Sequence, residues 1–511
     1  MLARLNIGMA IAMTGVVFLA VVVERERGAE LPKPTGESAP AGLASYYDQH
    51  VDWSKCRGGL CGTIRVPLDY AVPDGPTVGL NVKLRPADDE PTRRMLFVNP
   101  GGPGGSAFEY ADGFAGQSTK AMRSELGIVG VDPRGVGTSE ALECVTKSGL
   151  DDFLDVDNSP DDPAETADLR RAFSNLGESC VKNTGDLVKT MSTEVTVRDL
   201  DVARAVLGQE KLDFYGASYG TQIGATYAHL FPDHTGRVIL DGGIDPSLSN
   251  RRQARDQAVG FEKSLRRFLT YCSKLQSCPV GKDVDAAEER VADVLEEADK
   301  DPLKSEKSGV RDATEAAAFR GIAYALYERD RWPLLVRTLS RATFGEGTGL
   351  RQLADEYDQR DDLGYDNNSN VAYHAVRCLD FPNAPSYTKV RDFEPAFADA
   401  APVFGPSMAW SVAECSAWPV ESLHPQGSVS ADGVDSIIVV GTTHDPATPY
   451  VWSESLVRQL GSARLLTREG DGHTGYNTGN RCVDDLVADH LLGRPVPRGE
   501  LRCDEDGRLV P

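Results

Sequence analysis

The sequence lacks the surplus of basic residues that nucleic-acid-binding proteins need. Its 511 residues include 54 Lys and Arg against 77 Asp and Glu, so the formal net charge at pH 7 is −23. A chain of this charge repels phosphate backbones and releases no counterions by binding them. We therefore expect no nucleic-acid partner. The acidity itself is typical of a soluble protein, and attraction of cationic substrates is the alternative.

Internal repeats with periods of about 20 to 50 residues are also absent, which excludes solenoids and propellers. Hydrophobic residues make up 41% of the chain and charged residues 26%. These proportions are those of globular proteins and argue against a disordered chain or one that crosses a membrane many times. Most of the chain is expected to fold.

One long apolar run stands at the N-terminus. Arg4 precedes the uncharged residues 7–23, and charged residues close the run. This pattern predicts an export signal at residues 1–23. The run is slightly shorter than the about 20 residues that span a bilayer, and no Ala-x-Ala site follows closely, so a retained membrane anchor is the alternative. Residues 24–43 are rich in Pro, Gly, Ala and Glu without periodicity, and we interpret them as a flexible tether.

Cys-x-x-Cys clusters are missing, which disfavours a zinc site, and we expect neither metal nor cofactor. No Cys follows the apolar run closely enough to accept a lipid anchor. The ten cysteines are an even number, and export favours disulfides. Spacing alone does not fix their connectivity. Pairing of neighbours in sequence is the simplest hypothesis, and it gives Cys56–Cys61, Cys144–Cys180, Cys272–Cys278, Cys378–Cys415 and Cys482–Cys503.

Short β-branched and apolar runs predict eight strands, which alternate with helices over much of the chain. The runs are residues 62–66, 78–84, 95–99, 127–132, 212–215, 238–241, 436–441 and 463–467. From residue 250 to 401 the pattern changes to charged amphipathic helices without a convincing strand. We therefore predict an α/β core at residues 44–249 and 402–511, with a mainly parallel sheet, and a helical lid inserted at residues 250–401.

A nucleophile motif lies between a predicted strand and a predicted helix. Residues 216–220 read Gly-Ala-Ser-Tyr-Gly, the Gly-x-Ser-x-Gly pattern that places a serine on a strained turn at a helix N-terminus. By itself the pattern also arises by chance in a glycine-rich chain. Its position between strand and helix identifies Ser218 as the candidate nucleophile of an α/β-hydrolase.

A nucleophile of this kind needs N–H donors for the oxyanion that develops on the substrate. Tyr219 supplies one by its position after the serine. Residues 99–105, Asn-Pro-Gly-Gly-Pro-Gly-Gly, follow the third predicted strand and allow the backbone to approach the substrate closely. An ordinary glycine-rich turn is the alternative for this segment.

The base and the acid of the site are expected at the ends of later strands. Among eight histidines, His473 lies in a glycine-rich loop just after the last core strand, where it could reach the serine. Asp445 follows the preceding strand and fits the order Ser, Asp, His of this fold. Asp241, also at a strand end, is the competing acid, and we expect it to help turn the chain into the insertion. Asp132 is interpreted as stabilising a turn.

Four segments together, residues 99–105, 132–139, 215–221 and 441–449, resemble exported tripeptidyl aminopeptidases of actinobacteria, in the prolyl-aminopeptidase family of serine peptidases. The resemblance extends from about residue 46 to the C-terminus. It implies Ser218 as nucleophile, Asp445 as acid and His473 as base, with Gly102 and Tyr219 as oxyanion donors. Asn99 departs from the His that many relatives carry before these glycines.

The expected function is therefore an exported serine peptidase that acts on peptides with free N-termini through an acyl-enzyme. A carboxylesterase with the same three residues is the first alternative, and a non-catalytic binding module on the same fold is the second. An aminopeptidase needs a carboxylate for the substrate's ammonium group. Glu262, near the start of the lid, is the first candidate, and a solvated helix face is the other interpretation of it.

Overall fold

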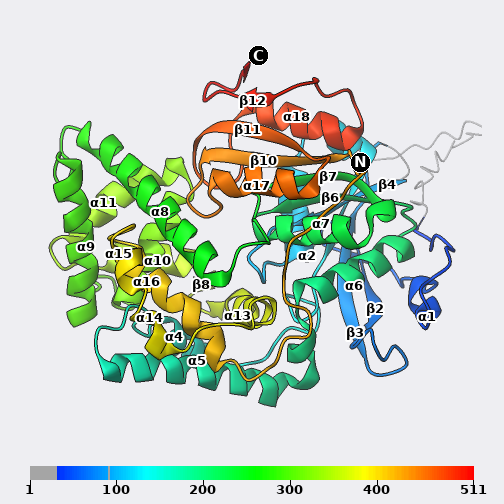
Figure 1. Cartoon of the computed structure of the whole chain (residues 1–511). Coiled ribbons are helices and arrows are strands. Elements are labelled where there is room, and N and C mark those ends of the chain that lie inside the picture. The colour runs from blue at the N-terminus through cyan, green and yellow to red at the C-terminus, as the bar shows by residue number, and fades with distance from the viewer. Residues whose placement is uncertain (1–30, 90–92, 511) are drawn as a thin grey trace, which may run out of the picture.

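The computed structural model describes residues 31–89 and 93–510, so the expected signal or anchor at residues 1–23 lies outside them. A mixed sheet of eleven strands forms the centre, in the order β1-β2-β3-β5-β4-β6-β7-β10-β11-β12-β13 (Figure 1). All neighbouring pairs from β5 to β12 are parallel, and the pairs at the two edges are antiparallel. The eight longer strands are β2 (Gly59–Pro67), β3 (Thr77–Arg85), β4 (Arg94–Asn99), β5 (Leu126–Val131), β6 (Leu212–Ala217), β7 (Thr235–Asp241), β10 (Ile437–His444) and β11 (Arg464–Asp471).

These eight strands correspond to the eight apolar runs of the sequence, but the expected strand count was too low. Three further strands lie at the edges: β1 (Ser54–Cys56), β12 (Leu501–Cys503) and β13 (Leu509–Val510). Each has only two or three residues, which is too short for the alternation of buried and exposed side chains that marks a strand in a sequence.

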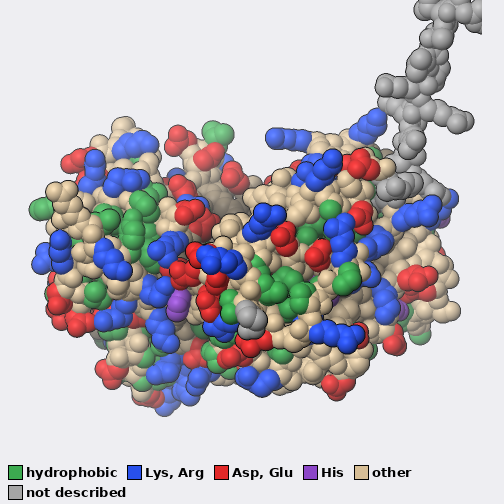
Figure 2. Space-filling model, turned by 90° about the horizontal axis from the view of Figure 1, so that it is seen from above, with side chains coloured by type: hydrophobic (Ala, Val, Ile, Leu, Met, Phe, Trp, Pro, Cys, Tyr) green, Lys and Arg blue, Asp and Glu red, His purple; other side chains and the backbone are tan. Residues whose placement is uncertain are grey.

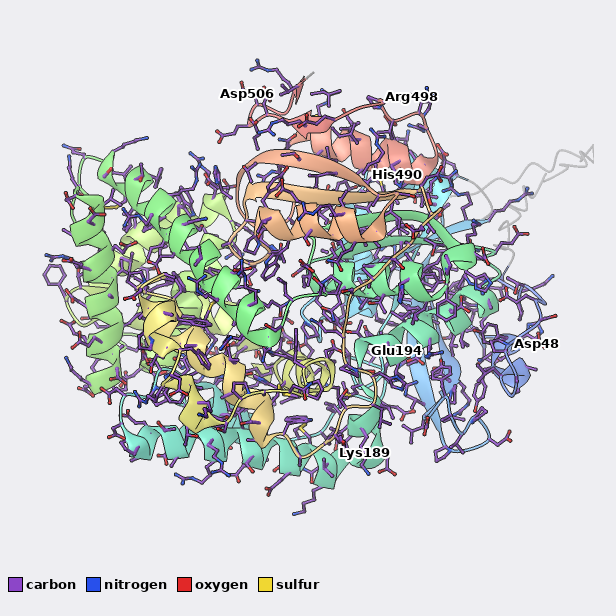
Figure 3. The ribbon with its side chains drawn as sticks, in the orientation of Figure 1. Asp48, Lys189, Glu194, His490, Arg498 and Asp506 are labelled. Carbon is purple, nitrogen blue, oxygen red and sulfur yellow. A yellow bond between two sulfur atoms is a disulfide. The ribbon has the colours of Figure 1, made fainter. Side chains whose placement is uncertain are left out.

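Helices cover both faces of the sheet because consecutive residues of its central strands are apolar and point alternately to opposite sides. Leu96 and Val98 pack in the cluster of α2 (Ala107–Gln117), α3 (Lys120–Glu125) and α18 (Arg481–Leu492), whereas Met95 and Phe97 face the other side. That side is covered by α1 (Ala44–Tyr47), α6 (Thr193–Val206), α7 (Tyr219–Leu230) and α17 (Tyr450–Leu460). Figure 3 shows His490 of α18 and Glu194 of α6 on opposite sides of the sheet.

A helical layer lies beside the sheet, on the left of Figure 1. It follows β7 in the chain and ends before β10, and it has its own apolar cluster. Its helices are α8 (Asn250–Ser273), α9 (Val284–Lys300), α10 (Glu315–Leu326), α11 (Trp332–Ala342), α12 (Thr348–Tyr357), α13 (Ser369–Asp380), α14 (Tyr387–Val390), α15 (Glu394–Ala398), α16 (Gly405–Trp410) and the 3₁₀ helix η4 (Ser411–Ala417). A short hairpin, β8 (Arg360–Asp361) and β9 (Gly364–Tyr365), precedes α13.

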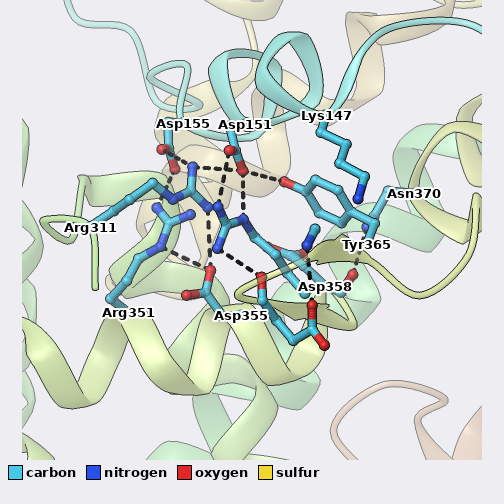
Figure 4. A network of polar contacts seen from close by, with 12 residues as sticks. Lys147, Asp151, Asp155, Arg311, Arg351, Asp355, Asp358, Tyr365 and Asn370 are labelled. Atoms are coloured by element: carbon cyan, nitrogen blue, oxygen red, sulfur yellow. Dashed lines mark hydrogen bonds and ion pairs between the residues drawn. The ribbon is translucent and has the colours of Figure 1, made fainter. Parts of the chain in front are cut away.

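Besides α16 and η4, which follow residue 401, two helices that precede the expected lid range pack on this layer. They are α4 (Lys147–Leu154) and α5 (Pro163–Thr184), and Leu169 and Phe173 of α5 belong to the lid's apolar cluster. The carboxylate of Asp155 lies 2.9 Å from Arg311 and 2.6 Å from Arg351 (Figure 4). An amphipathic pattern predicts a helix at α5 but not which layer its apolar side covers, and residues 250–401 therefore do not include every helix over the site.

The expected tether is partly ordered against the core. In its described part, residues 31–43, Glu37 pairs with the buried Arg204 at 2.6 Å, and the Thr35 N–H donates to the Ala205 carbonyl at 2.9 Å. Leu43 is buried in the core. The interpretation of this part as a free tether was wrong, because a buried guanidinium needs a carboxylate partner and Glu37 supplies it.

The ten cysteines form five disulfides, and each joins the neighbours in sequence that we expected: Cys56–Cys61, Cys144–Cys180, Cys272–Cys278, Cys378–Cys415 and Cys482–Cys503. Within the described ranges, no helix has the length and apolar character needed to cross a bilayer. Figure 2 shows acidic and basic side chains interspersed over the face seen from above, so the negative charge is not gathered there into one patch.

Candidate active site

Ser218 occupies a sharp turn between β6 and α7. Its backbone has φ +54° and ψ −121°, a conformation that residues other than glycine rarely adopt. The turn requires glycine nearby, because a Cβ on Gly216 would lie 2.2 Å from the Gly220 carbonyl oxygen. The Ser218 N–H donates to the Asp241 carbonyl at 2.8 Å. Helix α7 begins at the next residue, so its first N–H groups lack partners within the helix and face the serine.

The glycine-rich segment after β4 lies directly against Ser218. A Cβ on Gly101, whose φ is +94°, would lie 2.4 Å from the Ala217 carbonyl oxygen and 3.0 Å from the Ser218 Cβ. The Gly101 N–H donates to Asn99 Oδ1 at 2.9 Å. Asn99, which stands where many relatives carry a His, therefore stabilises the backbone of this glycine-rich segment. The Gly102 N–H has no hydrogen-bond acceptor in the described part of the chain. The segment that contains Gly102 therefore lies against the turn formed by Ser218 and Tyr219.

Asp445 and His473 are in direct contact. Nδ1 of His473 lies 2.9 and 3.0 Å from the two carboxylate oxygens of Asp445. The carboxylate also accepts hydrogen bonds from the backbone of Ala447, Thr448 and Thr474 at 2.9, 2.8 and 3.1 Å. Burial lowers the pKa of His473, but the adjacent carboxylate outweighs this effect, and the pKa is raised above its ordinary value of 6.5.

Asp241, the competing acid, binds the segment that follows His473. Its buried carboxylate accepts the N–H groups of Gly475 at 2.7 Å and Tyr476 at 2.9 Å, and the Tyr215 hydroxyl at 2.9 Å. Burial raises the pKa of Asp241 to about 6, although these hydrogen bonds oppose the shift. Asp241 thus anchors the His473 loop, whereas we expected it to help turn the chain into the insertion.

Asp132 has the turn-stabilising contacts that we expected of it. It accepts hydrogen bonds from the Ser106 hydroxyl, the Phe108 N–H and the Thr138 N–H at 2.8, 2.9 and 2.8 Å. These bonds join the turn after β5 to the start of α2, and they leave Asp132 without contact to His473.

Ser218, Gly102 and His473 line one cavity of about 590 Å³, which we call the large cavity. A second cavity of about 180 Å³, the small cavity, also includes Ser218 and Gly102 in its wall. Helices beside the sheet supply most of the remaining wall of the large cavity. Their aromatic contributors include Phe153, Phe173, Phe319, Tyr324, Tyr327, Tyr357, Tyr373 and Trp410.

The lid contacts His473 through residues that the sequence did not single out. The backbone carbonyl of Tyr327, just after α10, accepts a hydrogen bond from the backbone N–H of His473 at 2.8 Å. The centroids of the two rings lie 5.2 Å apart in an edge-to-face arrangement. Asp471 pairs with Arg267 of α8 and, at 2.9 Å, with Arg329. No sequence motif marks these contacts, because each joins segments that are far apart in the chain.

Glu262 does not line either cavity, which corrects the expectation that it binds the substrate. Its side chain is buried, and Oε2 accepts the N–H groups of Val403 and Phe404 at 3.0 and 3.2 Å. Burial raises the pKa of Glu262 to about 7, with a further rise from the neighbouring Glu288. This glutamate therefore joins α8 to the segment before α16.

A different acid, Glu414 of η4, lines the large cavity. Its side chain is 12% exposed, and no Lys or Arg in the described ranges pairs with it. Its Oε2 lies 3.3 Å from Nδ1 of His374, and neither atom has a hydrogen-bond partner. The adjacent Cys415 was the only signal near it in the sequence, and that signal is unspecific.

Known proteins resemble this chain over most of its length. Residues 401–503 match the family described as TAP-like protein. Serine protease Hip1 of Mycobacterium tuberculosis is 33% identical over 89% of this chain and 91% of its own. Carboxylesterase B of the same species is 34% identical over 89% and 88%, and tripeptidyl aminopeptidase of Streptomyces lividans is 30% identical over 93% and 89%.

Proposed function

Because the chain belongs to the family of α/β-hydrolases that includes Hip1, carboxylesterase B and tripeptidyl aminopeptidase, it is a hydrolytic enzyme, and we propose that it is an exported aminopeptidase. Its substrates would be peptides with a free N-terminus, cleaved near that end. The observation that carries the proposal is the large cavity, which holds Ser218 and His473 together with the carboxylate of Glu414, with which no Lys or Arg of the described residues pairs.

In the proposed mechanism Ser218 Oγ attacks the peptide carbonyl and His473 Nε2 takes its proton. Asp445 holds the imidazole through Nδ1 and stabilises the imidazolium that forms. The N–H groups of Gly102 and Tyr219 would bind the oxyanion. His473 then protonates the departing amine, and a water molecule hydrolyses the acyl-enzyme by the same route. Ser218 and His473 share the cavity without a mutual hydrogen bond in the described residues, and such bonds commonly tighten when substrate binds.

Glu414 is the proposed partner of the substrate's ammonium group. Transferring an ammonium group into a cavity lined by aromatic side chains is unfavourable unless a carboxylate meets it there. Glu414 supports this role because it is nearly buried and lacks a basic partner other than His374. By contrast, Glu356 in the same wall is already paired with Arg331 at 2.9 Å.

Export is the second part of the proposal. The five disulfides support an oxidising destination, because such bonds persist outside the cytoplasm. The apolar run at residues 7–23 supports an N-terminal signal or a retained anchor.

A carboxylesterase is the alternative, favoured by the 34% identity to carboxylesterase B. The same three residues would hydrolyse esters, so only the substrate preference separates the two functions. An enzyme that hydrolyses simple esters but leaves peptide amides with free N-termini intact would favour the alternative.

The test begins with covalent labelling by a fluorophosphonate, which reacts with an activated serine. We expect labelling of the wild-type enzyme and none of Ser218→Ala, which should stay folded but lose nearly all turnover. Absence of labelling in the folded wild-type enzyme would contradict both the peptidase and the esterase.

Specificity is tested with tripeptide amides that carry a fluorogenic leaving group and either a free or an acetylated N-terminus. We expect acetylation to raise KM strongly, and Glu414→Gln to remove most of this discrimination. Glu356→Gln is the matched control and should keep it, because that carboxylate is already paired. Equal cleavage of free and acetylated peptides by the wild-type enzyme would overturn the aminopeptidase assignment.

A further inference from the structure

Arg377, near the end of α13, lines both the large and the small cavity, as Ser218 does. It is only 8% exposed, so its guanidinium is almost entirely removed from bulk water. Arginine is always charged in proteins. The chain therefore holds a buried positive charge in the wall of the cavity that contains the nucleophile.

Among the described residues, no carboxylate forms an ion pair with this charge. The guanidinium donates to Asn250 Oδ1 and, at 3.5 Å, to Gln253 Oε1, both of which are neutral amide oxygens on α8. Its Nε has no hydrogen-bond partner. The rings of Tyr373 and Phe381 lie 5.9 and 5.4 Å from Cζ. Within residues 31–89 and 93–510, no acid lies within 4.0 Å of its nitrogens.

Arg320 is the other arginine in the walls of the two cavities, and its positive charge is compensated by an acid of the protein. It also lines both cavities, but its Nε donates to the buried carboxylate of Asp358 at 3.1 Å, and its Nη1 donates to the Leu154 carbonyl at 2.7 Å. Arg320 is thus neutralised by the fold, whereas Arg377 is not.

Asp380 is the nearest acid along the helix, and its oxygens are already used. It accepts the Thr193 N–H at 2.9 Å, the Thr193 hydroxyl at 2.6 Å and the Gln222 amide at 3.1 Å. Burial raises the pKa of Asp380 to about 7, although these hydrogen bonds oppose the rise. The charge of Arg377 also opposes the rise, so Asp380 acts on the guanidinium from a distance, and no ion pair joins the two side chains in the described residues.

A buried charge without an ionic partner is unfavourable, and such groups are normally paired with an opposite charge or bind a ligand. We propose that Arg377 binds a carboxylate of the substrate in the small cavity, beside the carbonyl that Ser218 attacks. This inference rests on the proposed peptidase function and deepens it, because it makes the enzyme selective for peptides with an acidic group next to the cleaved bond.

The small cavity suits such a group in size and lining. Its volume is about 180 Å³, and its wall includes the amide side chains of Gln253 and Gln257 beside Ser218. Amide N–H groups and a guanidinium fork are the donors that a carboxylate prefers. The carboxylate has two sources in a peptide: the side chain of Asp or Glu at the attacked carbonyl, or the C-terminus of a short leaving peptide.

Two matched substrate pairs test the proposal on the wild-type enzyme and separate these sources. The first pair is a tripeptide fluorogenic amide ending in Glu and its Gln counterpart, both with a free N-terminus. The second is a tetrapeptide of alanine with a free C-terminal carboxylate and its C-terminal amide. We expect the acidic member of one pair to have a kcat/KM roughly 10- to 100-fold higher, the effect of a hydrogen-bonded charge pair.

Arg377→Gln should reduce that preference to about unity, and Arg377→Lys should retain part of it because the charge remains. A merely structural role, joining α8 to α13, would lower thermal stability in Arg377→Gln and leave the preference unchanged. Fluorophosphonate labelling of each variant checks that the folded site persists.

Equal kcat/KM values within both pairs for the wild-type enzyme would overturn the inference while the peptidase function stands. A preference that survives in Arg377→Gln would also overturn it. Absence of cleavage of every peptide would instead indicate failure of the proposed function, so the two failures are distinguishable.

Discussion

Two buried aspartates contact the segment that carries His473, and they bond to different atoms of it. Asp445 accepts from the imidazole itself, whereas Asp241 accepts only from the backbone of residues 475 and 476 and from Tyr215. We expect Asp445→Asn to lower kcat by roughly 1,000- to 10,000-fold, because an amide favours the wrong imidazole tautomer. Steady-state kinetics with a free tripeptide amide would measure this loss.

Asp241→Asn is the matched variant, since it makes the same chemical change in an equally buried carboxylate. We expect a much smaller loss in kcat, because the remaining carbonyl oxygen can still accept a backbone N–H. A larger loss for Asp241→Asn than for Asp445→Asn would reverse the assignment of the acid.

The pH dependence of activity follows from the raised pKa of His473. A general base works in its neutral form, so kcat/KM should rise with pH as the imidazolium loses its proton. The midpoint should lie above 6.5, because the Asp445 carboxylate stabilises the charged form more than burial disfavours it. A pH profile of kcat/KM measures the midpoint, and a midpoint below 6.5 would contradict the described contact.

The sequence identified those site residues that a short pattern marks. Ser218, Asp445 and His473 each follow a strand in a recognisable order, and the structure brings the last two into contact. Glu414 and Arg377 follow no such pattern, because their meaning depends on which charges of other segments surround them. The expectation that Glu262 binds the substrate was wrong for the same reason. The sequence does not show whether a charged residue on a helix faces solvent, a cavity or a neighbouring backbone.

At the scale of elements, the sequence indicated the eight longer strands and the helical character of the lid but not the attachment of the lid. Helix α5 has an amphipathic pattern, yet only the fold shows that Leu169 and Phe173 pack with the lid. The pairs of Asp471 with Arg267 and Arg329 likewise join β11 to lid residues that lie 204 and 142 positions earlier in the chain. Such contacts are decided by tertiary packing, which local periodicity does not encode.

We expect Asp471→Asn to destabilise the enzyme by about 1–3 kcal/mol, because two arginines lose a buried, charged acceptor. It should also lower kcat, since the same junction holds His473 against the Tyr327 carbonyl. Chemical denaturation and kinetics measure the two effects. The control is Asp186→Asn, whose exposed pair with Lys189 should contribute no more than about 1 kcal/mol. Equal effects of the two variants would contradict a role for Asp471 in lid attachment.

At the scale of the whole molecule, disulfides of the sheet and of the lid close loops of different length. Cys56–Cys61 closes five residues of a hairpin at the sheet edge, whereas Cys378–Cys415 closes 37 residues and joins α13 to η4. The second bond directly follows Arg377 and Glu414 in the chain. It therefore holds the two segments that present the proposed charged groups to the cavity.

We expect removal of the Cys378–Cys415 disulfide, as the double variant to alanine, to reduce stability by about 4 kcal/mol, against about 2 kcal/mol for Cys56–Cys61, because the longer loop restricts the unfolded chain more. The variant without Cys378–Cys415 should also lose much of its preference for free N-termini, whereas the variant without Cys56–Cys61 should keep it. Thermal unfolding and the free and acetylated tripeptide amides measure both effects. If the two variants lose stability and selectivity equally, the disulfide does not position the charged wall of the cavity, and the packing of α13 and η4 suffices to hold it.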